Sequence, residues 1–267
     1  MVRRKTTIIK RWKQFLEIAS GEVTFLNHYA EVRAQFNLIA SQSPVANVGS
    51  EFWTFVTQAF AHEMIFRISR LTEGQFKDRK GRVLKHLEVS SLTALLEEFA
   101  EHPEYLSRAQ YLGVSPVTFE EYLRKHPSRF DPPDRYNYDR LNREFDDLAG
   151  KGANHIAAAV IQSDLATLGK VTKRLKAYRN KRLAHLSVKR GRFRNPKMTE
   201  ITRAITEIDR FMRKYFLALN CASHPLEFGH VDITDIFLKP WIKNENNQKE
   251  LQRRFEKARE RQRKKRS

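Results

Sequence analysis

The chain contains a single cysteine, Cys221, among its 267 residues. One thiol cannot form an intrachain disulfide or a cysteine-based zinc site, so we expect the protein to reside in the reducing cytoplasm. No stretch approaches the roughly 18–20 apolar residues of a membrane span. The basic N-terminus is followed by no apolar run of signal-peptide length, because Lys10, Arg11 and Lys13 interrupt it. The sequence therefore predicts a cytoplasmic protein that makes no use of a membrane.

Glycine and proline are also scarce, with 10 and 9 copies, and the alternation of apolar and polar residues that is typical of strands is nearly absent. Apolar residues recur at helical spacing instead, which predicts an all-α fold. Helices are expected over 5–19, 22–40, 50–72, 136–148 and from 164 and 195 onward. Ser50, Ser90 or Ser91, and Asp164 are candidate N-caps, and Pro116 and Pro196 are expected to start helices.

Two further patterns concern the organisation of the chain. Residues 50–72 are apolar on nearly all sides, which predicts that this helix occupies the centre of a bundle. We expect one helical domain over 1–243, with an irregular helical insertion over 74–135. A basic tail over 244–267, helical or disordered, then follows. Ten of the last 20 residues are Lys or Arg and three are Glu, so the tail is polar all round.

The net charge of +19 and the isoelectric point near 10.1 indicate an anionic partner, such as nucleic acid, an acidic protein or an anionic surface. The charge is concentrated, because residues 165–199 contain twelve lysines and arginines and no acidic residue. Residues 178–185 have the sequence YRNKRLAH, which places Arg179, followed by Asn180, six positions before His185. A group able to transfer protons therefore lies in the most positive part of the sequence.

Arg179 and His185 together suit the cleavage of RNA by its own 2′-hydroxyl. Histidine exchanges a proton near pH 7, while arginine holds a phosphate oxygen in two-point contact and stabilises charge on the phosphorane. On an ideal helix the two residues are about 9 Å apart along the axis and about 120° apart around it. They can act on one phosphate only if the helix is distorted or if a second copy of the chain supplies one of them, so we expect a homodimer.

This chemistry requires no cofactor, and the sequence has no HExxH motif, cysteine cluster or obvious carboxylate cage, so we expect no metal site. Lys181 and Arg182 lie one turn from His185 and are expected to support the reaction. Contacts with RNA are expected from Lys173, Arg174, Lys176, Lys189, Arg190, Arg192 and Arg194.

Spacing alone leaves other functions open. A lone histidine in a basic helix is often structural or exposed. In that case the chain would be a non-catalytic helical protein that binds RNA or DNA through the same basic surface. A third alternative is an interaction module whose basic tail docks on an acidic protein. The other histidines, such as His28, His62, His102, His155 and His230, form no ligand spacing and are interpreted as structural or exposed.

Residues 179–185 resemble the R-x(4–6)-H motif of the HEPN superfamily, including the Asn that follows the Arg in many members. The wider stretch 175–187, and residues 68–72 at the expected end of a helix, look most like the abortive-infection (AbiU-type) branch. The likeness extends over about 51–219, and only the short motif is specific.

The resemblance implies an up-and-down helical bundle, a homodimer with a composite active site, and a metal-independent endoribonuclease that acts as a toxin or antiviral effector. It makes Arg179 and His185 the catalytic pair and Asn180 a supporting polar residue. Members often add a polar or acidic residue from an earlier helix, for which Glu63 is the candidate. The alternative role of Glu63 is to pair with Arg67, four positions further on.

The resemblance also bears on regulation. Members controlled by a nucleotidyltransferase antitoxin tend to carry a tyrosine two residues after the histidine, where this chain has Ser187. An antitoxin or another regulatory protein therefore remains an expected partner whose kind the sequence does not specify.

Overall fold

The computed structural model describes residues 2–42, 50–74, 91–127, 135–183 and 194–220, together with Ile233, Lys249 and Arg253. The regular elements of this part are all helical, and its one extended pairing is an isolated bridge between Ser107 and His155. The α-helices are α1 (Val2–Gln42), α2 (Ser50–Thr72), α3 (Leu92–Glu101), α4 (Arg108–Leu112), α5 (Phe119–Lys125), α6 (Tyr136–Ala149), α7 (Ala158–Tyr178) and α8 (Met198–Asn220). The predicted all-α fold is confirmed.

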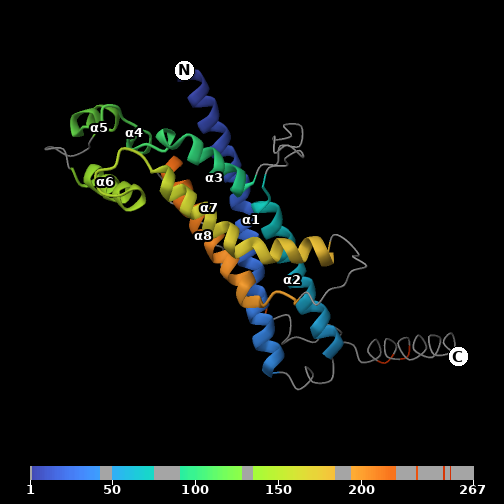
Figure 1. Cartoon of the computed structure of the whole chain (residues 1–267). Coiled ribbons are helices and arrows are strands. Elements are labelled where there is room, and N and C mark those ends of the chain that lie inside the picture. The colour runs from blue at the N-terminus through green and yellow to red at the C-terminus, as the bar shows by residue number, and fades with distance from the viewer. Residues whose placement is uncertain are drawn as a thin grey trace, which may run out of the picture.

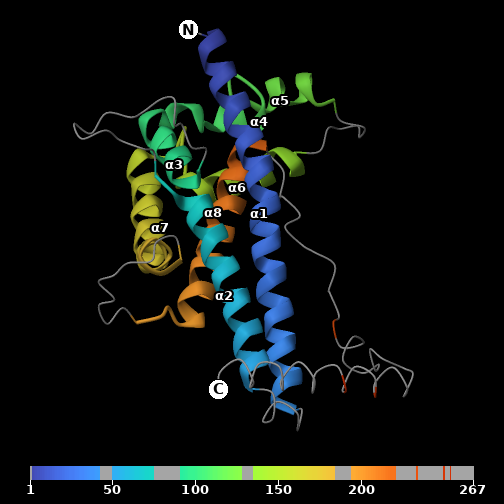
Figure 2. The same cartoon turned by 90° about the vertical axis from the view of Figure 1, so that its right-hand side faces the viewer.

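Three long helices form the body of the molecule. Helix α1 runs antiparallel to α2 and α8, and the three pack side by side along the long axis (Figures 1 and 2). Helix α7 packs across α2 and α8, and α3 lies against α7. The short helices α4, α5 and α6 gather at the end of the bundle where α1 begins (Figure 1). No helix in the described ranges is long and apolar enough to cross a membrane.

The core is continuous from α1 to α8 and includes α3. Trp12 of α1 packs edge-on against Phe99 of α3, with ring centres 4.6 Å apart, and Phe99 lies 5.1 Å from the ring of Tyr215 on α8. All three side chains are buried. Burying an aromatic side chain stabilises the fold by about 1.5–3 kcal/mol, so α3, which falls within the predicted insertion 74–135, contributes to the main core.

Helix α1 corrects the prediction of two separate helices over 5–19 and 22–40. It continues without a break through Gly21, around which an added Cβ would meet open space. Glycine lowers the stability of a helix by about 1 kcal/mol relative to alanine. That cost is outweighed by the buried stripe on either side of it, which consists of Leu16, Ala19, Val23 and Leu26.

The starts of several helices also differ from the sequence prediction. Helix α7 begins six residues before Asp164, which lies buried inside it and accepts hydrogen bonds from the Tyr215 hydroxyl at 2.9 Å and from Lys214 Nζ at 2.6 Å. The prediction that Asp164 caps this helix is therefore wrong. Helix α5 is capped by Thr118, not started at Pro116, whereas the Ser91 hydroxyl caps α3 as predicted.

Helix α2 meets the prediction of a central position only in its second half, where Met64, Ile65 and Ile68 are buried. In its first half Phe52 and Phe55 are exposed, by 55% and 68%. The buried half matters for the site, because it carries the C-terminal end of α2 to the end of α7.

Candidate functional site

The predicted motif lies where α7 ends. Regular α-helix stops at Tyr178, and residues Arg179–Leu183 continue as a π-helical turn packed against α2. A π turn replaces i→i+4 hydrogen bonds by i→i+5 bonds and is often found at functional sites. Residues 179–183 therefore do not follow the ideal α-helix on which Arg179 and His185 would point in different directions. His185 itself lies outside the described residues.

The guanidinium of Arg179 is held on two sides. Its Nη2 and Nη1 donate to the two carboxylate oxygens of Glu73, at 2.7 and 3.2 Å, and its Nε and Nη2 donate to Oδ1 of Asn180, at 2.9 and 2.8 Å. Only 16% of the Arg179 side chain is exposed. Four of the five guanidinium N–H groups are thus engaged, which fixes the plane of the group and leaves one N–H on Nη1.

Glu73 directly follows the last residue of α2, and its position explains how two cations are accommodated. The C-terminus of a helix carries partial negative charge. Lys176 donates to the Thr72 carbonyl oxygen at this terminus, which also accepts a hydrogen bond from the Thr93 hydroxyl at 2.8 Å. The acidic residue and the helix end therefore hold Lys176 of α7 and Arg179 of the π turn, which are three positions apart.

The surroundings of Glu73 and Lys176 lower the pKa values of both side chains. The hydrogen bond from Arg179, opposed in part by burial, lowers the pKa of Glu73, and the charge of Lys176 adds to the effect. Burial lowers the pKa of Lys176, although Glu73 acts in the opposite direction. The Glu73 carboxylate is therefore ionised at neutral pH, and it neutralises much of the charge that Arg179 brings to the motif.

A small cavity adjoins the motif on the side of α2. It has a volume of about 170 Å³, and Tyr178, the residue before Arg179, forms part of its wall. The Tyr178 hydroxyl lies 3.3 Å from Nε2 of His62 on α2. His62 was predicted to be structural or exposed. The structure brings its imidazole to Tyr178, beside the motif, because α2 and α7 pack together.

The predicted supporting carboxylate, Glu63, has another partner. Its Oε1 accepts a hydrogen bond from Arg67 Nε at 2.7 Å, and Arg67 also binds Glu22 of α1 at 2.9 Å. This is the pairing that the i,i+4 spacing offered as the alternative. The acidic residue that contacts Arg179 is Glu73, which was not among the predicted site residues. Its one signal was its place at the end of a helix, near which cations are favoured.

The residues predicted to contact RNA fall into three groups. Arg174 binds Glu200 at 2.6 Å and donates to the carbonyl of Arg194 at 3.1 Å, so it fixes the segment that leads into α8. Lys176 is held at the end of α2. Lys173 and Arg194 are exposed, whereas Lys189, Arg190 and Arg192 lie outside the described residues. The predicted supporting residues Lys181 and Arg182 are also exposed.

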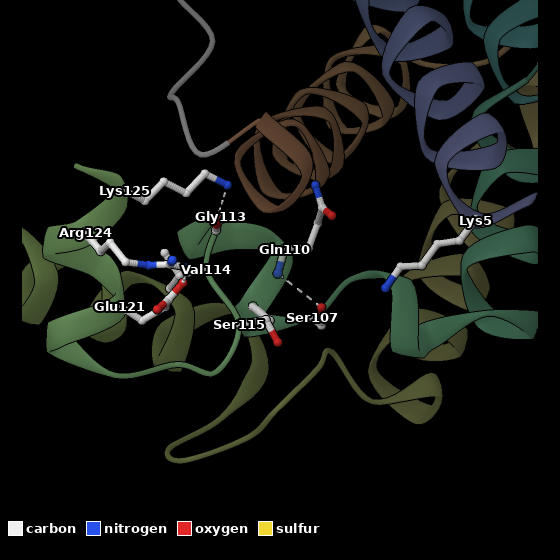
Figure 3. A pocket seen from close by; sticks show the side chains of 10 residues that line it. Lys5, Ser107, Gln110, Gly113, Val114, Ser115, Glu121, Arg124 and Lys125 are labelled. Atoms are coloured by element: carbon white, nitrogen blue, oxygen red, sulfur yellow. Dashed lines mark hydrogen bonds and ion pairs between the residues drawn. The ribbon is translucent and has the colours of Figure 1, made fainter. Parts of the chain in front are cut away.

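A larger concavity of about 650 Å³ lies at the other end of the molecule, between α4, α5 and the start of α1 (Figure 3). Its cations have partners. Lys125 donates to the Gly113 carbonyl, Arg124 binds Glu121 at 2.5 Å, and Lys5 lies over the ring of Tyr105. Arg124 is thus paired with a carboxylate, whereas Lys125 and Lys5 are engaged by a carbonyl oxygen and an aromatic ring.

No family model matches the chain, and no curated protein or solved structure matches it either. Within the described ranges, no group of three or more histidine, cysteine or acidic side chains is placed to hold a metal ion. The chemistry of the site must therefore be argued from its own residues.

Proposed function

We propose that this chain is a metal-independent endoribonuclease of the HEPN type that acts as a toxin or antiviral effector. The observation that carries the proposal is the clamped guanidinium of Arg179, which lies at a distorted helix end inside the acid-free stretch 165–199. An arginine whose plane is fixed by neighbouring groups is preorganised to bind a charged phosphorane.

The reaction follows from the chemistry of these groups. A base removes the proton of the RNA 2′-hydroxyl, the 2′-oxygen attacks the adjacent phosphorus, and the 5′-oxygen leaves with a proton from an acid. The products are a 2′,3′-cyclic phosphate and a 5′-hydroxyl. His185 is assigned to proton transfer, Arg179 to the phosphorane, and Asn180 to the orientation of Arg179. A homodimer would provide two copies of each group, one for each end of the reaction.

Glu73 has a defined place in this scheme. Its carboxylate occupies the two-point face of Arg179 that a phosphate would also prefer. RNA must therefore either use the remaining N–H of Arg179 or displace Glu73. In both cases the carboxylate weakens the binding of the ground-state phosphate.

The test is cleavage of RNA in the presence of EDTA by the wild-type chain and by Arg179→Ala and His185→Ala. Each substitution is expected to reduce the rate at least 100-fold, about 2.7 kcal/mol in the transition state. Arg203→Ala, which removes an exposed arginine of α8, serves as the control and is expected to retain activity. Equal cleavage by all four chains, or none by any of them, would overturn the proposal.

A second candidate is a non-catalytic protein that binds RNA or DNA through the same surface. The exposed Lys173, Lys181 and Arg182, which lie on α7 and the π turn, favour it. It predicts binding with a steep dependence on salt, unchanged by His185→Ala, and no turnover.

A further inference from the structure

Arg33 of α1 differs from the paired arginines of the bundle. Its Nε atom is buried and makes no hydrogen bond to any described residue. Burial lowers the pKa of Arg33, and no carboxylate within the described ranges opposes that shift. A guanidinium with a buried, unbonded N–H and no counter-charge is costly, since arginine remains protonated and the lost hydration of that group has to be replaced. An external anion would provide the missing partner.

Arg33 lines the cavity of about 170 Å³ beside Tyr178. Cavities that bind drug-sized ligands usually measure about 300–1,000 Å³. This cavity is smaller and has room for about five waters at roughly 30 Å³ each, which matches a single phosphate group better than a whole nucleotide. Its walls come from α1, α2, α7 and the start of α8: Arg33, Thr57, Gln58, Ala61, His62, Ile65, Tyr178, Asn195, Pro196, Met198 and Ile201.

The electrostatics of the cavity favour an anion. The described residues that line it include no acidic side chain. Asn195, Pro196 and Met198 lie at the N-terminus of α8, a helix of 23 residues, where the helix dipole is positive. The carboxylate of Glu200 in the first turn of α8 is already bound by Arg174, at 2.6 Å, and by the backbone N–H of Lys197, also at 2.6 Å.

We propose that this cavity is a phosphate-binding site in which Arg33 donates hydrogen bonds to the phosphate oxygens and the side chains of Gln58, His62 and Asn195 supply further donors. Tyr178 and Asn195 in its wall flank the segment that carries the R-x(4–6)-H motif. We assign a phosphate bound here to the same RNA that Arg179 engages, because Tyr178 directly precedes Arg179 in the chain. The assignment of that phosphate to an RNA substrate rests on the proposed function, whereas phosphate binding itself does not.

The first experiment uses inorganic phosphate and the full chain. Thermal unfolding is followed as chloride is replaced by phosphate at constant ionic strength. The wild-type Tm is expected to rise saturably, and Arg33→Gln is expected to lose this response. Arg203→Gln, a matched change of an exposed arginine on α8, is expected to keep it. A response in Arg33→Gln equal to that of the wild type would overturn the site.

A second variant keeps the proposal testable if Arg33→Gln folds poorly. Gln58→Glu would place a carboxylate in the same cavity, where it can pair with Arg33. We expect this variant to unfold at a higher temperature than the wild type without phosphate and to show no phosphate response. A wild-type phosphate response in Gln58→Glu would contradict the proposal.

The source of the phosphate is decided with a 2′-O-methyl RNA, which cannot be cleaved by 2′-hydroxyl attack. Fluorescence anisotropy measures its affinity over a range of salt concentrations. Loss of one phosphate contact in Arg33→Gln should weaken binding and reduce the salt slope by about one. An unchanged slope, combined with a lost phosphate response, would reject RNA and assign the site to a free phosphate compound. Neither readout requires cleavage, so both remain valid if the nuclease proposal fails.

Discussion

Arg108 and Arg33 show two ways in which this fold treats an arginine whose side chain is buried in full or in part. Arg108, at the start of α4, donates to the carbonyl of Ala153, to Asn142 and to Asp146, and it lies 4.8 Å from the ring centre of Phe145. Arg33, in the long helix α1, has a buried Nε with no hydrogen-bond partner in the described ranges and faces a cavity instead.

The difference between these two arginines indicates that the two regions of the molecule use positive charge for different purposes. Arg108 of α4 and Arg140 of α6 are paired with Asp146 and Glu144, so their charge maintains the fold. Beside α2, α7 and α8, Arg33 of α1 has no carboxylate partner among the described residues. Arg179 lies between these extremes, because Glu73 and Asn180 occupy four of its five N–H groups. The region that suits a phosphate ligand is therefore identified by N–H groups without a described hydrogen-bond partner, more than by positive charge alone.

The largest effect on stability is expected at Arg108. Arg108→Met would leave the carbonyl of Ala153 and the side chain of Asn142 without their donor, and should lower the free energy of unfolding by about 3 kcal/mol. Urea denaturation measures the loss. Arg140→Met, which breaks an i,i+4 pair on the partly exposed face of α6, is the control and should cost less than about 1 kcal/mol. Equal losses of unfolding free energy in the two variants would contradict the distinction between a buried, hydrogen-bonded arginine and a surface arginine.

The same substitution at Arg33 should act in the opposite direction. Arg33→Met removes a desolvated charge that has no described partner, so we expect the free energy of unfolding without phosphate to rise by up to about 1 kcal/mol. Urea denaturation in chloride buffer measures this gain. A loss comparable to that of Arg108→Met would show that Arg33 is already satisfied, and the distinction between the two arginines would no longer hold.

The smallest effect is expected at Glu73, and it depends on pH. Because the Glu73 pKa is lower in the folded state than its usual value near 4.5, its contribution to stability is present above that value and is lost as pH falls through the folded pKa. Glu73→Gln should therefore be less stable than the wild type at pH 7, by under about 1 kcal/mol. The gap should close in acid. Denaturation at a series of pH values measures it.

Two observations accompany that test. Glu101→Gln, a change of an exposed glutamate at the end of α3, is the control and should show no comparable closing of the gap. Glu73→Gln should also bind the 2′-O-methyl RNA a few-fold more tightly, because the guanidinium of Arg179 is released from the carboxylate. Weaker RNA binding by Glu73→Gln would indicate that Glu73 positions Arg179 for binding and does not compete with the phosphate.

Local features of the sequence were sufficient to predict the bounds of a helix where the local preference and the packing agree. The range of α2 and the Ser91 cap of α3 follow from apolar spacing and a capping hydroxyl, and both are confirmed. The predictions fail where packing outweighs a local signal. Gly21 does not end α1, because the buried stripe continues on both sides of it. Asp164 does not cap α7, because its carboxylate is used inside the bundle by Tyr215.

The sequence by itself determined the helical class, the concentration of positive charge and the motif that contains Arg179. These depend on residues close together in the chain, whose spacing can be read directly. Only the tertiary structure decided which charges are compensated. Glu73 meets Arg179 across 106 residues, and Arg33 has no described carboxylate partner, because both outcomes depend on how α1, α2, α7 and α8 pack. Helical spacing specifies which face of a helix is apolar, but it does not specify which other helix that face will meet.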